Sequence, residues 1–424
     1  MRISQFPRIN ELFYGYRIIA AIFFSLAIIS GCGLYAFGLF VHPLEAAFGW
    51  SRGEIMTASM VFALVMGITA PFIGKLITRY GARRIMTPGA IIGGLGFALL
   101  PLMSETWHFY ALYAVIALGY AAIGLVPATM VVSNWFKKRR GTAIGIMSVG
   151  VGLGGLVLAP LIGGYLIPNF GWQTSYLFIA GLTWTFIPLA LFVIRTQPSD
   201  MGLYADGMPA PEQTIEPGII GTTPTDYTLK TAIITSAFWL IAISFLVNSF
   251  SHLGVLQNQA AHLEDISFSP AIAGTTAGLI GLGSTFGKFF FGWLCDRMPV
   301  KYVWAIANCF QVAGIVILLT IEPTSPQSLL WTYAILFGFG IGGWLPTMSI
   351  LTSDNFGIVH YGLIFGTINL IHSFGSATGP LFAGNIFDST GSYQFAFNVF
   401  LILYIVTIAT ALVVRRPKPL ANLN

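Results

Sequence analysis

The chain has 424 residues, of which 56% are hydrophobic and 8% are charged, and its formal net charge is +5. Because soluble domains carry about 25% charged residues, this composition excludes an ordinary soluble enzyme or binding module and indicates a protein embedded in a lipid bilayer. The positive charge lies mainly between apolar stretches, where membrane topology accounts for it, so it gives no sign of nucleic-acid binding.

Six apolar stretches in the first half of the chain are long enough to span a bilayer. A helix needs about 20 residues to cross about 30 Å of hydrocarbon, and only helices or closed barrels are stable there. The predicted spans are Tyr16–Val41, Glu54–Ile77, Ile85–Met103, His108–Val132, Thr142–Ile167 and Thr174–Ile194. The first lacks a small-residue cleavage site and further spans follow it, so we interpret it as a helix rather than a signal peptide.

A polar segment, Arg195–Lys230, separates the two halves. It is rich in Pro, Gly, Asp and Thr and lacks apolar periodicity, as is typical of a linker. Six more spans follow it: Ala232–Gln259, Ala271–Cys295, Tyr302–Ile321, Ser328–Ser353, Leu363–Phe387 and Gln394–Val414. The sequence therefore predicts an all-α membrane protein with twelve transmembrane helices. Residues 1–194 and 231–424 would form two six-helix bundles, joined by a cytoplasmic linker at 195–230.

The basic residues predict the orientation, because cytoplasmic loops retain Lys and Arg. Twelve spans place nearly all of them on one side: Arg2, Arg8, Arg17, Lys75–Arg84, Lys137–Arg140, Arg195, Lys230, Arg297, Lys301 and Arg415–Lys418. Arg52 alone falls on the opposite side. We therefore expect both termini in the cytoplasm, and the compact loops indicate a multi-pass protein of the plasma (inner) membrane.

The two halves also resemble each other. Gly74–Arg79 (GKLITR), at the end of the second span, recurs as Gly292–Arg297 (GWLCDR) at the end of the eighth. The Gly and Pro pattern of the fifth span recurs in the eleventh. Two duplicated halves with a binding site between them at mid-membrane are expected for transporters whose bundles rock against each other.

Specific motifs add a family resemblance. Gly74–Arg84 (GKLITRYGARR) and Gly292–Lys301 resemble the loop signature of the major facilitator superfamily, over nearly the whole chain. Gly49–Arg52 (GWSR) and Asn134–Ile146 (NWFKKRRGTAIGI) resemble the monocarboxylate-porter and oxalate:formate-antiporter group within it. The resemblance implies alternating access to a central site.

The loop signature also predicts a cytoplasmic gate braced by Asp296, Arg297, Arg79 and Arg83. The acidic residue of the signature is Asp296 in the second copy but Thr78 in the first. We therefore expect the two sides of this gate to differ.

Lys288 is the one Lys, Arg, Asp or Glu near the middle of any predicted span. A central lysine costs about 3 kcal/mol on insertion scales, so such a residue usually faces a watery cavity on the path of a substrate. The resembling group carries an arginine at this position. An ammonium is a point charge without the bidentate fork of arginine. Oxalate transporters have a second cation where this chain has Ile368, so we expect a monocarboxylate, moved by proton symport or anion exchange.

Four further residues complete the predicted substrate site. Counting along each helix at about 1.5 Å per residue places His372 and Trp344 at the depth of Lys288. Asn369 lies three residues before His372 on nearly the same face. Tyr35 aligns with a tyrosine that lines the cavity in the resembling group. A lone histidine within a helix is also compatible with simple packing.

Additional cavity residues are proposed with packing kept as an open alternative. Asn248 and His252 lie one turn apart on the seventh span, and Tyr120 lies near the middle of the fourth. Ser284 stands one turn before Lys288, where animal members of the group often carry an aspartate.

Two other functions stay open. Glycines of the fifth span resemble a motif of drug:proton antiporters, so an exporter of larger amphipathic compounds is one alternative, and a non-transporting membrane sensor is another. The sequence has no G-x-x-x-x-G-K-[ST] loop for ATP and no paired metal ligands. We therefore expect no enzymatic activity, cofactor or metal. The expected partners are a small organic anion, with or without a coupled proton, and the lipid bilayer, and the protein is expected to work as a monomer.

Overall fold

The computed structural model describes residues 13–136, 140–207, 227–357 and 361–417. Within these residues every regular element is a helix. The N-terminal half comprises α1 (Gly15–Ile28), a π-helical continuation (Ile29–Tyr35), a 3-10 turn (Phe37–Phe40), α2 (Val41–Phe48), α3 (Arg52–Tyr80), α4 (Ala82–Leu99), a 3-10 turn (Leu100–Leu102), α5 (Thr106–Ile123), α6 (Leu125–Trp135), α7 (Arg140–Ala159), a second π-helical segment (Pro160–Leu166), α8 (Ile167–Trp184) and α9 (Phe186–Phe192).

The C-terminal half follows two short 3-10 turns, Pro198–Met201 and Ala205–Gly207, in the described part of the linker. Its helices are α10 (Leu229–Ala232), α11 (Ser236–Asp265), α12 (Pro270–Cys295), α13 (Val300–Leu319), α14 (Gln327–Ile341), α15 (Trp344–Phe356), α16 (Tyr361–Thr390) and α17 (Gln394–Val413). Part of the predicted linker, 208–226, lies outside the described residues. So do several of the basic residues used to predict the orientation: Arg2, Arg8, Lys137–Arg139 and Lys418.

The helices supply the predicted twelve spans. Among the described residues, nine stretches are long and apolar enough to cross a membrane. One of them, Thr142–Phe192, has 51 residues and holds two spans, because Gly171 (φ 80°, ψ 167°) interrupts the helix. The helices α12 and α16 supply the remaining two. Both carry many Gly, Ser and Thr residues, which suits helices that pack between the two halves.

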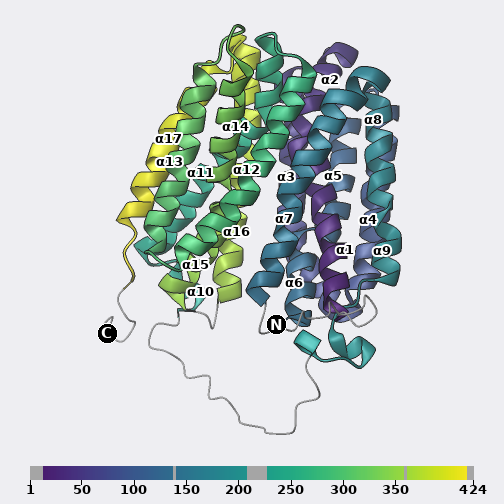
Figure 1. Cartoon of the computed structure of the whole chain (residues 1–424), viewed down its shortest axis with the longest axis vertical. Coiled ribbons are helices and arrows are strands. Elements are labelled where there is room, and N and C mark those ends of the chain that lie inside the picture. The colour runs from purple at the N-terminus through teal and green to yellow at the C-terminus, as the bar shows by residue number, and fades with distance from the viewer. Residues whose placement is uncertain (1–12, 137–139, 208–226, 358–360, 418–424) are drawn as a thin grey trace, which may run out of the picture.

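The two halves stand side by side as two bundles (Figure 1). The first turn of α1 and the last turn of α17 lie at the same end, together with α9 and α10, which flank the linker (Figure 1). We call this end the linker end. We call the opposite end the lock end, because a cluster of ion pairs around Arg52 joins the two halves there. The shared end of the two described termini agrees with an even number of spans.

The start of α3 is fixed by its own sequence. Ser51 accepts a hydrogen bond from the backbone N–H of Glu54 (3.2 Å), and the Glu54 carboxylate accepts one from the N–H of Ser51 (2.8 Å). This capping box satisfies two otherwise unpaired backbone donors. As a result, Arg52 stands in the first turn of α3, at the lock end, beside the C-terminal half.

Candidate functional site

The halves meet along two pairs of helices, and the first pair is α7 and α12. A Cβ atom at Gly278 would lie 3.1 Å from the carbonyl oxygen of Leu156, and one at Gly281 would lie 2.6 Å from that of Gly152. Glycine at such positions lets two helix backbones approach closely. Because the two helices run antiparallel, these contacts also fix their register.

The second pair is α3 and α16. A Cβ atom at Gly67 would lie 3.3 Å from the Cβ of Ser373, and one at Gly384 would lie 3.0 Å from the carbonyl oxygen of Arg52. The helix α16 therefore follows α3 from its middle to the lock end.

Toward the linker end the halves separate. Gly145 lies seven residues from Gly152 on the same face of α7, and Gly292 lies eleven residues from Gly281 on the same face of α12. A Cβ atom at Gly145, Gly292 or Gly366 would nevertheless meet no atom of the described residues within 4 Å. The interface is closed at the lock end and open at the linker end.

Lys288 lies on the face of α12 that meets the N-terminal half. Thr285, three residues earlier, packs against α7 on that face. Ser284, one turn earlier, lies close to the hydroxyl of Tyr35 from the first span. Lys288 is half-buried, and its ammonium makes no hydrogen bond or ion pair with any described residue. The register of α7 and α12 places Lys288 opposite Gly145, where the interface between the halves begins to open.

His372 and Trp344 form a stacked pair near this point. Their ring centroids are 5.0 Å apart, with an interplanar angle of 13°. Trp344 begins α15 just after Gly342, and a Cβ atom at Gly342 would lie 2.5 Å from the backbone nitrogen of Lys288. His372 is 8% exposed, and its Nε2 atom has no partner among the described residues. The three predicted residues thus lie on adjoining segments of the C-terminal half.

Asn369 lies on the second contact between the halves. It is half-buried and one turn from Ser373, whose side chain faces Gly67 of α3. Together with Lys288, Asn369 occupies the first turn beyond the closed part of the interface.

The other predicted cavity residues divide into two groups. Ser284 lies between the halves, and His252 is buried near His372. Asn248 is buried and donates a hydrogen bond to Asn308 (2.8 Å) within the C-terminal half. Tyr120 is fully buried within the N-terminal half, where its hydroxyl bonds that of Thr183 (3.2 Å). The side chains of Asn248 and Tyr120 are thus each hydrogen bonded within their own half.

The predicted cytoplasmic gate is not assembled in this conformation. The guanidinium of Arg297 lies over the ring of Trp293 (4.1 Å), and that of Arg79 lies over the ring of Tyr80 (5.2 Å), each within its own half. Asp296 is exposed at the end of α12, and Arg83 lines a surface pocket of the N-terminal half. At the linker end no ion pair joins the halves among the described residues, which agrees with their separation there.

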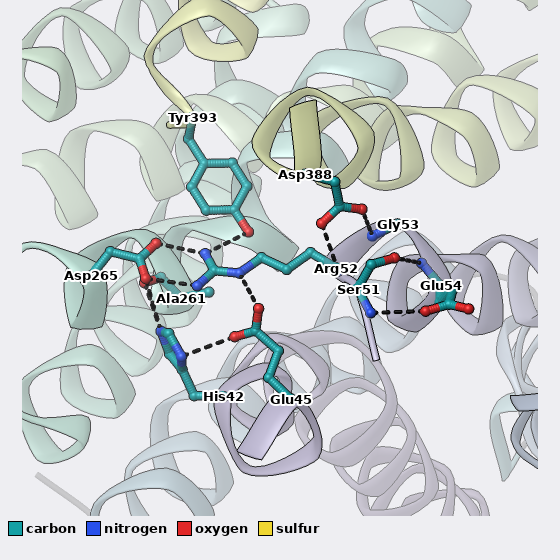
Figure 2. Close-up of polar contacts among 10 residues, drawn as sticks. All are labelled: His42, Glu45, Ser51, Arg52, Gly53, Glu54, Ala261, Asp265, Asp388 and Tyr393. Atoms are coloured by element: carbon teal, nitrogen blue, oxygen red, sulfur yellow. Dashed lines mark hydrogen bonds and ion pairs between the residues drawn. The ribbon is translucent and has the colours of Figure 1, made fainter. Parts of the chain in front are cut away.

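Arg52, a buried arginine, joins the halves at the lock end (Figure 2). Its partners were not predicted from the sequence. Arg52 of α3 is 3% exposed and donates two hydrogen bonds to the carboxylate of Asp265 of α11, at 2.5 and 2.7 Å. It also donates to Glu45 of α2 (2.9 Å) and to the hydroxyl of Tyr393 (3.1 Å). Its guanidinium lies 3.6 Å from the ring centroid of Phe387.

Two more residues extend this network. Asp388 of α16 accepts hydrogen bonds from the backbone N–H groups of Arg52 (2.9 Å) and Gly53 (2.7 Å), so a carboxylate of one half caps a helix of the other. His42 of α2 lies between the carboxylates of Glu45 (3.1 Å) and Asp265 (3.2 Å). We call His42, Glu45, Arg52, Asp265, Asp388 and Tyr393 the lock, because they hold the two halves together at this end.

A family comparison covers almost the whole chain. The model described as Major Facilitator Superfamily matches residues 23–261 and 249–424. Similar curated proteins include monocarboxylate transporter 13 of Rattus norvegicus, 23% identical over 388 residues that cover 91% of this chain and 85% of that protein. Monocarboxylate transporter 11 of Homo sapiens is 24% identical over 389 residues, which cover 90% and 79% of the two chains.

Solved structures share the fold. The nucleoside transporter NupG aligns with a TM-score of 0.74 at 11% identity and covers 96% of this chain and 100% of its own. A bacterial homologue of the human lysosomal transporter Spinster, in an inward-facing and unoccupied conformation, aligns with a TM-score of 0.67 at 16% identity, covering 95% of each chain. At such low identity these likenesses concern the fold alone.

Proposed function

Because the chain belongs to the major facilitator superfamily, we propose that this relative of the monocarboxylate transporters carries a small organic anion by secondary active transport. A monocarboxylate of the lactate, pyruvate, acetate or formate type is the proposed substrate. The observation that supports this choice is the position of Lys288, a half-buried ammonium between the two halves with no carboxylate partner among the described residues.

In the proposed site the substrate carboxylate binds the ammonium of Lys288, which offers three donors and no acceptor. The hydroxyl of Tyr35, the amide of Asn369 and the imidazole of His372 add hydrogen bonds. The face of Trp344 supplies an apolar wall for the short carbon chain of the acid. Binding neutralises a charge that is otherwise costly to hold within the membrane.

Alternating access follows from the contrast between the two ends of the interface. With the lock closed, an anion would reach Lys288 from the linker end. Rocking of the bundles would then break the lock and bring Asp296, Arg297, Arg79 and Arg83 together as the opposite gate. If Lys288 releases its proton when the site is empty, the anion and a proton are carried together, and the result is proton symport. If the halves rock only when an anion is bound, the result is anion exchange.

Uptake into proteoliposomes tests this proposal. The purified protein would be assayed with radiolabelled lactate, pyruvate, acetate and formate, with and without an imposed pH gradient. We expect Lys288→Met to abolish uptake, because the side chain keeps its length and loses its charge, and Lys288→Arg to retain part of it. Stimulation by the gradient would favour symport over exchange.

The matched control is Lys301→Met, since Lys301 is a half-buried lysine at the linker end, remote from the proposed site. Its ammonium contacts the carbonyl oxygen of Leu412 (3.4 Å) and lies over the ring of Tyr302 (5.3 Å). This variant should transport like the unmodified protein. Unchanged carboxylate uptake by Lys288→Met contradicts the proposal. Transport of cationic amphipathic compounds instead of acids would establish the exporter alternative, and the absence of any flux would favour a sensor.

A further inference from the structure

The two ring nitrogens of His42 both face hydrogen-bond acceptors. Nδ1 faces the carboxylate of Glu45, and Nε2 faces both the carboxylate of Asp265 and the carbonyl oxygen of Ala261 (3.2 Å) (Figure 2). A neutral imidazole has one donor nitrogen and one acceptor nitrogen. In one of these contacts the lone pair of the ring nitrogen would therefore face a lone pair of an oxygen. Only the protonated ring, which donates from both nitrogens, satisfies the geometry of the closed lock.

The charges around His42 also favour the protonated ring. Glu45 lies on its own helix, Asp265 and Glu264 lie on α11, and Arg52 lies on α3. Asp388 of α16 and Tyr393, the residue before α17, face the arginine. Two cations, Arg52 and protonated His42, therefore stand against the two carboxylates that bind them both. A neutral His42 would leave this half-buried group with excess negative charge.

We propose that His42 is a proton-binding site that couples closure of the lock to the pH of the compartment it faces. The lock closes with a proton on His42, and that proton is released when the halves separate at this end and the ring loses Asp265. This inference rests on the alternating access proposed above, and it needs no particular substrate. It adds a proton site outside the membrane spans, separate from Lys288.

The direction of the pH effect follows from the two states of the ring. In the closed lock the hydrogen bond to Asp265, with that to Glu45, raises the pKa of His42 from its ordinary value of 6.5 to about 10. With the lock open the ring returns toward its ordinary value. The proton on His42 therefore favours closure fully below about pH 6.5, and this contribution is lost as the pH rises toward about 10. Within that range the ratio of closed to open protein falls by up to about tenfold per pH unit.

The acidic limit is set by the carboxylates. Burial alone would raise the pKa of Glu45, but its bonds to His42 and Arg52 outweigh burial and lower it. The Glu45 carboxylate therefore remains ionised through mildly acidic pH, and its contribution to the lock is lost only as the pH falls through that lowered value. Burial raises the pKa of Glu264 to about 7, so the effect of His42 is measured above that pH, without interference from Glu45 or Glu264.

A distance measurement in lipid nanodiscs, without substrate, tests the inference. Nitroxide labels would be attached to cysteines introduced at Ala47 on α2 and Gln394 on α17, two exposed positions at the lock end, after Cys32, Cys295 and Cys309 are replaced by alanine. Pulsed electron paramagnetic resonance then gives the fraction of closed lock. We expect this fraction to fall steeply between about pH 7 and 9.5, approaching tenfold per pH unit in the closed-to-open ratio.

Three variants make the result specific to His42. His42→Gln should flatten the pH dependence, and His42→Lys, which stays charged throughout, should hold the lock closed at alkaline pH. The control is His108→Gln: this histidine stands at the start of α5 at the lock end, where its ring bonds Ser104 and Glu105 of its own loop. That variant should keep the original slope.

Two outcomes would overturn the inference. One is a closed fraction that does not change with pH in the unmodified protein, and the other is a His42→Gln variant as steep as the original. Neither depends on carboxylate uptake, so a failure of the proton site is distinguishable from a failure of the proposed substrate.

Discussion

At the scale of single residues, Arg52 and Lys288 are both cations held away from bulk water, and they differ in what balances them. Arg52 has the carboxylates of Asp265 and Glu45 within hydrogen-bond distance. Lys288 has no carboxylate among the described residues. A buried cation with its counter-ions in place holds structure together, whereas one without them is suited to receive an anion from outside.

Replacing Arg52 should therefore do more than remove one contact. Arg52→Gln leaves the carboxylates of Asp265 and Glu45 without their main cation. Breaking a fully buried pair from one side costs about 3–5 kcal/mol, and the cost here is expected to be lower because these carboxylates are 23% and 27% exposed. We expect a lower melting temperature in nanodiscs and a larger fraction of open lock in the labelled protein.

The control for this variant is Arg416→Gln. Arg416 is 74% exposed and lies 3.8 Å from Asp354, an ion pair of the kind that contributes little to stability. Its removal should leave both readouts unchanged. If Arg52→Gln melts and opens like the Arg416 variant, the lock does not hold the halves together.

Residues differ in how far the sequence alone reveals them. Lys288 stands out because a charge in an apolar stretch is costly wherever the helix packs, and Arg52 stands out as the one basic residue on its side of the membrane. The partners of Arg52 could not be predicted in this way. Asp265 and Tyr393 are 213 and 341 residues away in the chain, and they approach Arg52 only through the docking of the two halves.

At the scale of helices, apolar length predicted the spans but not their interruptions. The first predicted span ends at Tyr35, after a π-helical segment, and α2 continues as a separate helix. The fourth span is divided at Gly124 (φ −83°, ψ −154°), and the tenth is divided at Gly342 and Gly343. Apolar residues continue across each interruption, so hydropathy cannot detect it. The interruption at Gly342 lies against Lys288 and brings Trp344 beside His372.

Larger side chains at two glycines of α12 should shift the fraction of closed lock in opposite directions. At Gly281 a larger side chain would meet the carbonyl oxygen of Gly152, whereas at Gly292, on the same face, it meets open space while the lock is closed. We expect Gly281→Leu to lower the closed fraction. We expect Gly292→Leu to raise it, because rocking would bring this position against the other half.

The label pair at Ala47 and Gln394 measures both effects on one scale. Equal shifts in the same direction would mean that these substitutions perturb packing in general, and that the halves do not rock about the contact of α7 and α12. A conservative Gly292→Ala variant, with little added volume, should resemble the unmodified protein.

At the scale of the whole molecule, the architecture is better determined than the cargo. The duplicated motifs and the twelve apolar stretches were sufficient to predict two six-helix bundles, and the fold persists in solved transporters that share only 11% to 16% of its residues. Substrate choice depends on a few side chains between the bundles. The mutual arrangement of those side chains emerges only when the halves are docked.

The proposed orientation predicts which end of the molecule is accessible from outside a cell. In a protein without its natural cysteines, Ala47→Cys should react with a membrane-impermeant maleimide added to intact cells, and Ser199→Cys in the linker should react only after the membrane is permeabilised. Both positions are exposed in the structure. Labelling of Ser199→Cys in intact cells would reverse the orientation and place His42 in contact with the cytoplasm.

The cap that Asp388 places on α3 has a kinetic consequence. The N–H groups of Arg52 and Gly53 have their acceptor on the opposite half, so every separation of the bundles at this end must also break these two hydrogen bonds at the beginning of a membrane helix. Water can replace those bonds only after the gap has opened, which puts the loss at the top of the barrier. The return stroke crosses the same dehydrated state, because water must leave those N–H groups and the Asp388 carboxylate before the bonds re-form. Loss of the Asp388 carboxylate is therefore expected to speed the departure from the state described here more than the return to it.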